Sequence, residues 1–199
     1  MSIQAITSAR SARKQARKHT HTPGTTHALS VVPAEPTERP VDADVYRNVF
    51  RRHAAGVVVI TADAGHGPVG FTATSLVSVS LLPPLVSFAI STTASSWPTV
   101  HAANSLVINF LDAGQTELAG RFATSGIDRF AEPTRWSRLD SGEPALDDAP
   151  SFLLGHVEHR FGVGDHHIIV ARLATHTERR EHDPLLYHDG RYATTDRPS

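Results

Sequence analysis

Two uncharged segments rich in serine and threonine are the parts of this sequence best suited to binding a small molecule. The first is GFTATSLVSVS at residues 70–80, which places five hydroxyl side chains within nine residues. Hydroxyls and free backbone N–H groups suit a neutral, flat, hydrogen-bonding ligand better than a cation. The alternative is a solvent-facing strand followed by a turn, in which the hydroxyls only face water.

The second segment is STTASSWPT at residues 91–99, just before an expected helix. Its hydroxyls and the unpaired N–H groups of a helix start together favour an anion, because a helix N-terminus carries partial positive charge. The alternative is that Ser95 or Ser96 only caps the helix. The sequence contains neither GxGxxG after a strand nor a Walker lysine, so the common nucleotide-binding motifs are absent.

A third feature is Gly-Asp-His-His at residues 164–167, which precedes an apolar strand. Gly-Asp is typical of a turn, and His166 at the mouth of a strand could hydrogen-bond a substrate or act as an acid. The alternative is a histidine that is satisfied within a hairpin. His166 and His167 point to opposite faces of a strand and HExxH is missing, so we expect no metal site. A serine hydrolase is disfavoured because GxSxG is also missing.

Composition divides the 199 residues into two unlike parts. Residues 1–40 hold six Arg and Lys against two acids, giving +4, while residues 41–199 hold 13 against 18, giving −5. We expect a basic and then Thr/Pro-rich disordered tail over 1–40, and one domain over 41–199. Transit-peptide, nucleic-acid or misassigned-start explanations of the tail stay open. The absence of cysteine excludes disulfides, thiolate metal sites and cysteine nucleophiles.

We expect a cytoplasmic protein with no membrane partner, because no apolar segment fits a secretion signal or a membrane span. We also expect no nucleic-acid partner, because residues 41–199 carry a net charge of −5. The elements that position the polar segments are mostly short strands, separated by Gly- and Pro-containing turns. This pattern predicts a mainly β antiparallel barrel or sandwich. Helices are expected at 42–53, 97–103 and 116–123, the last capped by Thr116. Strands are expected at 57–61, 69–74, 78–81, 85–91, 106–111, 151–161 and 166–175, with 185–192 closing the chain.

Seven segments together resemble the short-chain flavin reductase family, whose domain is an antiparallel FMN-binding split β-barrel. The resemblance extends from about Tyr46 to Tyr192 and leaves the tail outside. Its motifs are FRRHAAGVVVITA (50–62), GFTATSLVSVSLLPPLVSFAI (70–90), SSWP (95–98), LVINFL (106–111), LAGRFA (118–123), GDHHIIVARL (164–173) and PLLYHDGRY (184–192).

The resemblance implies a homodimer that uses NADH or NADPH to reduce FMN or FAD, and that supplies reduced flavin to a partner monooxygenase. It also implies roles for particular residues. The isoalloxazine and ribityl chain would be contacted by Thr72, Ala73, Thr74 and Ser75. The phosphate would be held by Ser95, Ser96 and Thr99, with Arg121 and Phe122 approaching from the helix. The nicotinamide would be contacted by His166, in a pocket bordered by Tyr187 and Tyr192.

Many relatives carry a Lys, Arg or Asn in the stretch that is Ser91–Ala94 here, so the phosphate charge would need Arg121 or the helix end. No catalytic residue is expected, because the cofactors carry the hydride transfer. A 2′-phosphate of NADPH would need a nearby arginine, and the sequence does not place Arg160, Arg172 or Arg191 relative to the site, so the choice between NADH and NADPH stays open. Two alternatives remain: a split-barrel flavoprotein that retains its flavin as an oxidase or oxygenase, and a non-catalytic flavin-binding protein.

Overall fold

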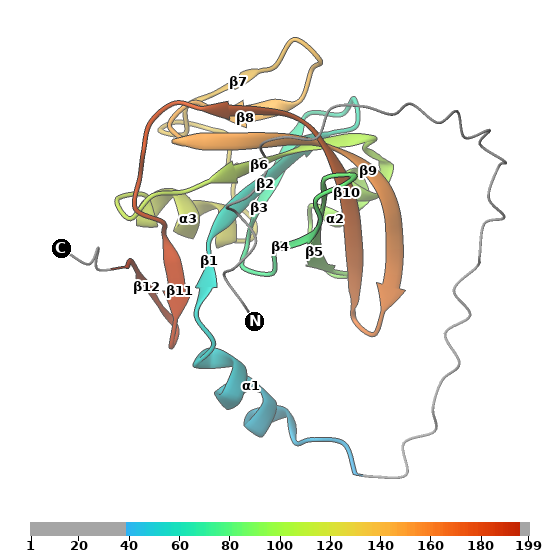
Figure 1. The fold of residues 1–199 in the computed structure, drawn as a ribbon, viewed down its shortest axis with the longest axis vertical. Coiled ribbons are helices and arrows are strands. Elements are labelled where there is room, and N and C mark those ends of the chain that lie inside the picture. Colours follow the sequence, from blue (N-terminus) through green and yellow to red (C-terminus); the bar gives the residue numbers. More distant parts are fainter. Residues whose placement is uncertain (1–38, 196–199) are drawn as a thin grey trace, which may run out of the picture. The chain divides into compact units, whose positions relative to one another are not determined.

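A seven-stranded antiparallel sheet, in the order β3-β2-β6-β9-β10-β5-β4, positions the polar segments (Figure 1). The structure is a computed structural model and describes residues 39–195, so all but the last two residues of the expected tail lie outside it. The strands of the sheet are β2 Val58–Asp63, β3 Pro68–Ala73, β4 Val77–Ser80, β5 Leu85–Ser91, β6 Ser105–Phe110, β9 Ser151–Val163 and β10 His166–Glu178.

Two small sheets and three short helices complete the described chain. The first small sheet has the order β1-β11-β12 and the second pairs β7 with β8. The fold is therefore mainly β and antiparallel with few helices, as the sequence predicts. The bounds are β1 Ala55–Gly56, β7 Trp136–Arg138, β8 Pro144–Leu146, β11 Leu186–His188, β12 Arg191–Ala193, α1 Ala43–Arg51, α2 Trp97–Ala102 and α3 Thr116–Ala123.

Strand β2 is buried on both faces, which explains the unbroken run of apolar residues at 57–60. Val58 and Ile60 belong to the core that lies within the curled sheet. Val57 and Val59 pack on the opposite side, in a second apolar cluster that includes Phe122 of α3. Strand β2 thus joins the barrel core to the helix that borders the polar segments.

The sheet curls until β3 and β5, which are not hydrogen-bonded neighbours, approach each other. The rings of Phe71 on β3 and Phe88 on β5 lie with centroids 6.1 Å apart. Beyond β3, the Ser75 hydroxyl accepts a hydrogen bond of 2.9 Å from the backbone N–H of Ala89. This curl agrees with the expected barrel and places the first hydroxyl segment beside the second.

Helix starts are formed differently at α1 and α3. Asp42 caps α1, accepting a 2.8 Å hydrogen bond from the N–H of Asp44. The predicted Thr116 cap of α3 is wrong: Gln115 is the N-cap residue and Thr116 is the first helical residue. Within residues 39–195, no helix has the length and apolar character that crossing a membrane requires.

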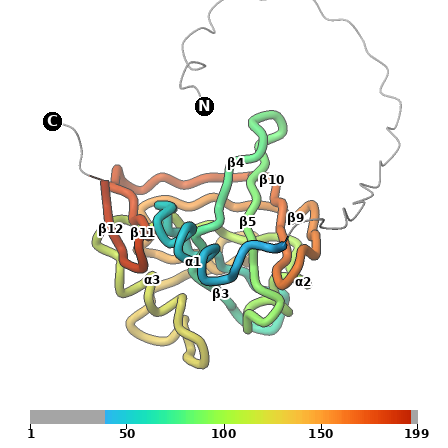
Figure 2. Tube along the Cα trace, turned by 90° about the horizontal axis from the view of Figure 1, so that it is seen from below, coloured from blue at the N-terminus to red at the C-terminus, as the bar shows by residue number. Residues whose placement is uncertain are grey.

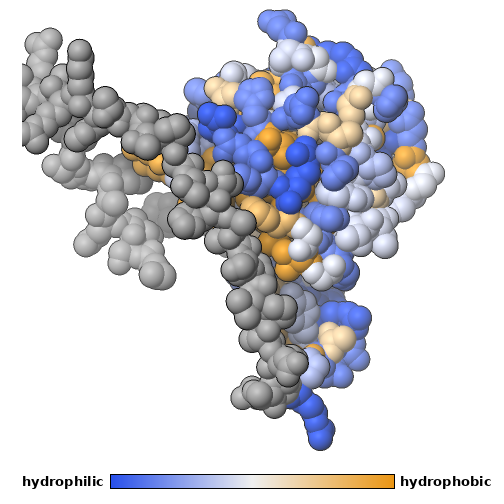
Figure 3. Space-filling view, turned by 90° about the vertical axis from the view of Figure 1, so that its right-hand side faces the viewer, coloured by the Kyte–Doolittle hydropathy of each residue, from blue (hydrophilic) through white to orange (hydrophobic). Residues whose placement is uncertain are grey.

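Helix α1 and the β4–β5 turn are among the places where apolar side chains remain on the surface. No residue of α1 is buried, and the turn between β4 and β5 carries two leucines that are more than four-fifths exposed, Leu81 and Leu82. Figure 2 shows the β4–β5 hairpin projecting from the rest of the sheet. Figure 3 shows apolar residues gathered among polar ones on the face that it presents.

Candidate functional site

The two hydroxyl segments line one cavity of about 610 Å³ between β3, β5, the end of α3 and the loop before α2. The structure thus brings together segments that lie about twenty residues apart in the sequence. Eight of the predicted site residues line this cavity, namely Thr72, Ala73, Thr74, Ser75, Ser95, Ser96, Phe122 and His166.

The hydroxyls of the first segment differ in their hydrogen-bond partners. Thr72 donates a 2.6 Å hydrogen bond to the carbonyl of Ala119 and so ties β3 to α3. Ser75 exchanges hydrogen bonds with the backbone of Ala89 on β5. Thr74 is exposed and its hydroxyl makes no hydrogen bond within the described part of the chain. Thr72 and Ser75 therefore fix the wall, and Thr74 is free to meet a ligand.

Arg129 supplies a positive charge that was not predicted from the sequence. Its guanidinium donates to the carbonyls of Thr124 at 2.9 Å and Gly70 at 3.0 Å, and lies 3.5 and 3.4 Å from the hydroxyls of Ser95 and Ser96. Burial lowers the pKa of Arg129, but an arginine stays protonated in proteins. A fixed cation beside two hydroxyls forms a site for an anionic group.

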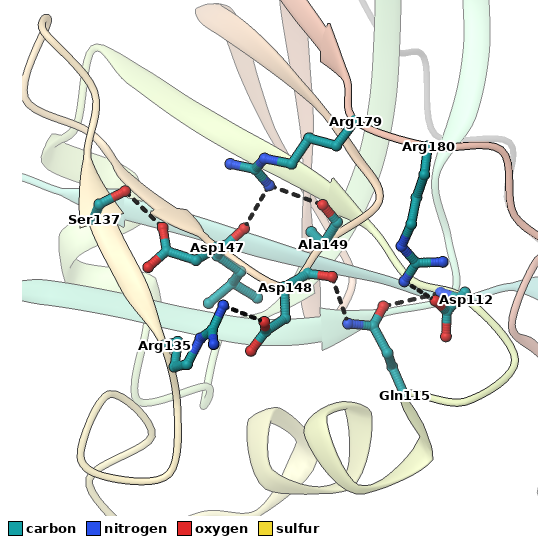
Figure 4. A network of polar contacts seen from close by, with 10 residues as sticks. Asp112, Gln115, Arg135, Ser137, Asp147, Asp148, Ala149, Arg179 and Arg180 are labelled. Carbon is teal, nitrogen blue, oxygen red and sulfur yellow. Dashed lines mark hydrogen bonds and ion pairs between the residues drawn. The ribbon is translucent and has the colours of Figure 1, made fainter.

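A polar network holds the start of α3 in place (Figure 4). Gln115 donates to the carbonyl of Asp148 at 2.9 Å, and the carboxylate of Asp148 pairs with Arg135 at 2.9 Å. Arg179, at the end of β10, donates to the carbonyl of Ala149 at 2.8 Å. These contacts join α3 to the segment that follows β8, and so fix the helix that presents Phe122 to the cavity.

His166 opens β10 at the other end of the cavity. Its register partner is Ser91 on β5, and Thr92 donates from N–H and hydroxyl to the carbonyl of Asp165, at 3.0 and 3.1 Å. The Asp165 carboxylate lies 2.7 Å from His166 Nδ1, and this hydrogen bond lowers the pKa of Asp165. In the neutral imidazole this contact leaves Nε2 as an acceptor for a ligand. His167 points away and stacks on Trp97, with centroids 3.7 Å apart.

Four predicted site residues lie away from this cavity, and their expected roles stay predictions. Thr99 is in the first turn of α2. Arg121 lines a separate cavity with Glu117 and Ile127. Tyr187 and Tyr192 face each other across β11 and β12, with ring centroids 5.5 Å apart. Burial and the neighbouring Tyr187 raise the pKa of Tyr192.

Comparison with known proteins identifies the family. The model for the flavin reductase like domain matches residues 50–196. The chain belongs to the flavin reductase family. It is 51% identical over 152 residues to an NADH:FMN oxidoreductase of Rhodococcus qingshengii, covering 74% of this chain and 79% of that protein.

Solved flavin reductases share the fold. The Streptomyces globisporus NADH:FAD oxidoreductase SgcE6, solved with NAD and FAD fragments, has a TM-score of 0.73 and 30% identity, covering 80% of this chain and 98% of that one. BorF, the flavin reductase component of a bacterial two-component tryptophan halogenase, has a TM-score of 0.70 and 30% identity, with coverages of 77% and 98%. The flavin reductase family membership confirms the resemblance, the fold and the expected oxidoreductase class.

Proposed function

We propose that this flavin reductase transfers a hydride from NADH to FMN in the cavity between β3, β5 and α3. The observation that carries the proposal is the composition of that cavity: neutral hydroxyls, one arginine and one histidine. A flat heterocycle with a phosphate-bearing chain fits this donor set, because the ring needs neutral hydrogen-bonding groups and the phosphate needs a cation.

Different residues of the cavity would contact different parts of the flavin. Ala73, Thr74 and Ser75 would border the isoalloxazine and ribityl chain. Ser95 and Ser96 would hold the phosphate together with Arg129, which takes the place that the sequence suggested for Arg121. This assignment is supported by the position of Arg129 beside both hydroxyls and of Arg121 in a different cavity.

Positioning is what this chain contributes to the reaction. The hydride passes from the reduced nicotinamide to the flavin, and this chemistry belongs to the cofactors. His166 would hydrogen-bond the nicotinamide end, while Phe122 would exclude water from one wall. Holding two flat rings at contact removes much of the entropic barrier, so no protein nucleophile or base is required.

The arginines favour NADH over NADPH. Among the residues lining the cavity in the described chain, Arg129 is the one arginine, and it lies beside Ser95 and Ser96. Arg160 is engaged by the carbonyls of Val100 and Ala103 at the end of α2. Arg172 pairs with Glu158 at 2.6 Å. A 2′-phosphate near His166 would therefore find no unengaged arginine in the cavity wall.

Reduced flavin would then leave for a partner monooxygenase, and the reductase would act as a homodimer. The open cavity and the two-component system named for BorF support the transfer. The alternative, a flavoprotein that keeps its flavin, predicts a yellow protein that stays yellow through desalting.

Steady-state oxidation of NADH and NADPH with FMN, FAD or riboflavin tests the proposal. We expect turnover with NADH and FMN, and a lower kcat/KM with NADPH. His166→Ala should raise the apparent KM for NADH and leave FMN affinity nearly unchanged. No nicotinamide oxidation in any combination would reject the reductase assignment. A His166→Ala variant with the wild-type apparent KM for NADH would reject the role of that residue.

A further inference from the structure

We infer that Trp97 and His167 form a positioning pair, which links the proposed phosphate site to the histidine at the nicotinamide end of the cavity. Through this pair, a flavin phosphate bound at Ser95 and Ser96 strengthens nicotinamide binding near His166. The inference rests on the proposed function, and it assigns no catalytic role to either member of the pair.

The rings of Trp97 and His167 are stacked nearly parallel. Their centroids lie 3.7 Å apart and their planes differ by 11°. His101, one turn further along α2, contacts the same indole with centroids 5.0 Å apart. Contact between aromatic rings is favourable beyond the apolar area that it buries, so the stack fixes the start of α2 against β10 (Figure 1).

Trp97 directly follows the two serines of the proposed phosphate site. Its N–H donates to the carbonyl of Ala94 at 2.9 Å, which closes the turn that contains both serines. The Ser96 hydroxyl donates to the carbonyl of Gly70 at 3.2 Å, and the Ser96 carbonyl accepts from the Val100 N–H at 3.0 Å. A shift of the indole therefore moves the serine hydroxyls relative to the cavity wall.

His167 directly follows the histidine of the nicotinamide end. Neighbouring residues of a strand face opposite sides, so His166 lines the cavity while His167 lies against α2. The His167 ring also covers Gly162 of β9, where a Cβ would lie 3.6 Å from two of its atoms. The imidazole thus contacts both the sheet and the helix, and its position is tied to that of His166.

Two further contacts join the same elements. Thr92 donates from its N–H and hydroxyl to the carbonyl of Asp165, at 3.0 and 3.1 Å. At the far end of α2, Arg160 of β9 donates to the carbonyls of Val100, at 3.4 Å, and Ala103. A ligand that orders one of two joined segments lowers the entropic cost of ordering the other. A phosphate that orders the serine loop therefore prepares the nicotinamide end.

Binding of NAD⁺ to the protein saturated with FMN or with riboflavin, measured by isothermal titration calorimetry, tests the pair. Both flavins present the same ring to the nicotinamide, and NAD⁺ has no hydride to transfer. The ratio of the two NAD⁺ dissociation constants therefore isolates the effect of the flavin phosphate. In the wild type we expect NAD⁺ to bind about 2- to 10-fold more tightly with FMN, which is the range that one aromatic contact can transmit.

Variants of the stack should change this ratio without general damage. His167→Ala removes the stack and should bring the ratio close to one, whereas His167→Phe keeps a flat ring and should retain the wild-type ratio. His159→Ala is the matched control, because His159 stacks on Phe161 of the same hairpin with centroids 5.6 Å apart and is exposed. It should retain the wild-type ratio. Trp97→Leu keeps an apolar side chain but cannot stack, so its ratio should also be close to one.

The outcomes separate this inference from the proposed function. A ratio of one in the wild type, or a wild-type ratio in His167→Ala with wild-type circular dichroism, overturns the positioning pair. If His167→Ala does not fold, a wild-type ratio in Trp97→Leu overturns it. A ratio of one in His167→Phe or His159→Ala also overturns it, because the effect would then not follow the stack. A wild type that binds neither flavin would reject the proposed function and this inference with it.

Discussion

Replacing Arg129 by glutamine tests the assignment of the flavin phosphate site. The substitution removes the positive charge but keeps a side chain that can donate hydrogen bonds. In the wild type the guanidinium lies 3.4–3.5 Å from the hydroxyls of Ser95 and Ser96 and is fixed by the carbonyls of Gly70 and Thr124. The same cation would make charge-assisted hydrogen bonds to a phosphate held by those hydroxyls.

The expected loss follows from that contact. A hydrogen bond to a charged group contributes about 1.5–3 kcal/mol, and 1.4 kcal/mol corresponds to a tenfold change in the dissociation constant. Arg129 is half-buried, so solvent screens the interaction in part. We therefore expect Arg129→Gln to weaken FMN binding about 10- to 100-fold.

Fluorescence titration with FMN and with riboflavin separates the phosphate contact from general damage to the cavity. Riboflavin lacks the phosphate, so Arg129→Gln should bind it nearly as the wild type does. Arg121→Gln tests the rival assignment from sequence, and Arg47→Gln, which removes an exposed ion pair on α1, is the neutral control. Equal losses of affinity for FMN and riboflavin in Arg129→Gln would refute the reasoning. A loss of FMN affinity in Arg121→Gln but not in Arg129→Gln would refute it as well.

Three further predictions concern the scaffold. A Cβ at Gly70 would lie 2.6 Å from the buried Phe122 ring. Gly70→Ala should therefore lower the free energy of unfolding by about 1–3 kcal/mol and Tm by about 2–4 °C per kcal/mol. Gly120→Ala, where a Cβ meets nothing within 4 Å, is the control and should not lower Tm. Although burial opposes it, the hydroxyls of Ser105 and Ser141 lower the pKa of Glu143 below its usual 4.5. Ionised Glu143 therefore stabilises the fold above pH 4.5, and this stability is lost as pH falls through the lower folded pKa. The free energy of unfolding in urea, measured across this range, should depend less on pH for Glu143→Gln than for the wild type. An equal pH dependence in the two proteins would contradict the prediction. Removing residues 1–40 should leave Tm and activity unchanged, and a loss of either would reject the domain boundary.

Elements with a strong local pattern could be predicted to the residue. Strand Leu85–Ser91 alternates between buried and half-buried side chains, and helix Thr116–Ala123 has the bounds expected from its spacing. Strands β7 and β8 were missed because three residues each are too short to show an alternation. These two strands pair with each other across a short turn, so their pairing is local and their length alone hid them.

The candidate site also contains residues that local sequence predicts and residues that it does not. The hydroxyl segments and His166 were predictable because their composition is unusual for strands and turns, and the structure places them on one cavity. Arg129 lies in a polar stretch with no motif, about thirty residues after Ser95 and Ser96, and the curl of the sheet with α3 brings it beside them. Arg121 is equally conspicuous in sequence, but the turn of α3 directs it to another cavity.

Rapid mixing of the protein and FMN with NADH under anaerobic conditions tests the central claim most directly. It follows the visible absorbance of FMN during one turnover, before any oxygen or partner protein takes part. We expect this absorbance to bleach much faster than in the same mixture without protein, and faster with NADH than with NADPH. Bleaching at the uncatalysed rate with both nicotinamides would contradict hydride transfer in this cavity.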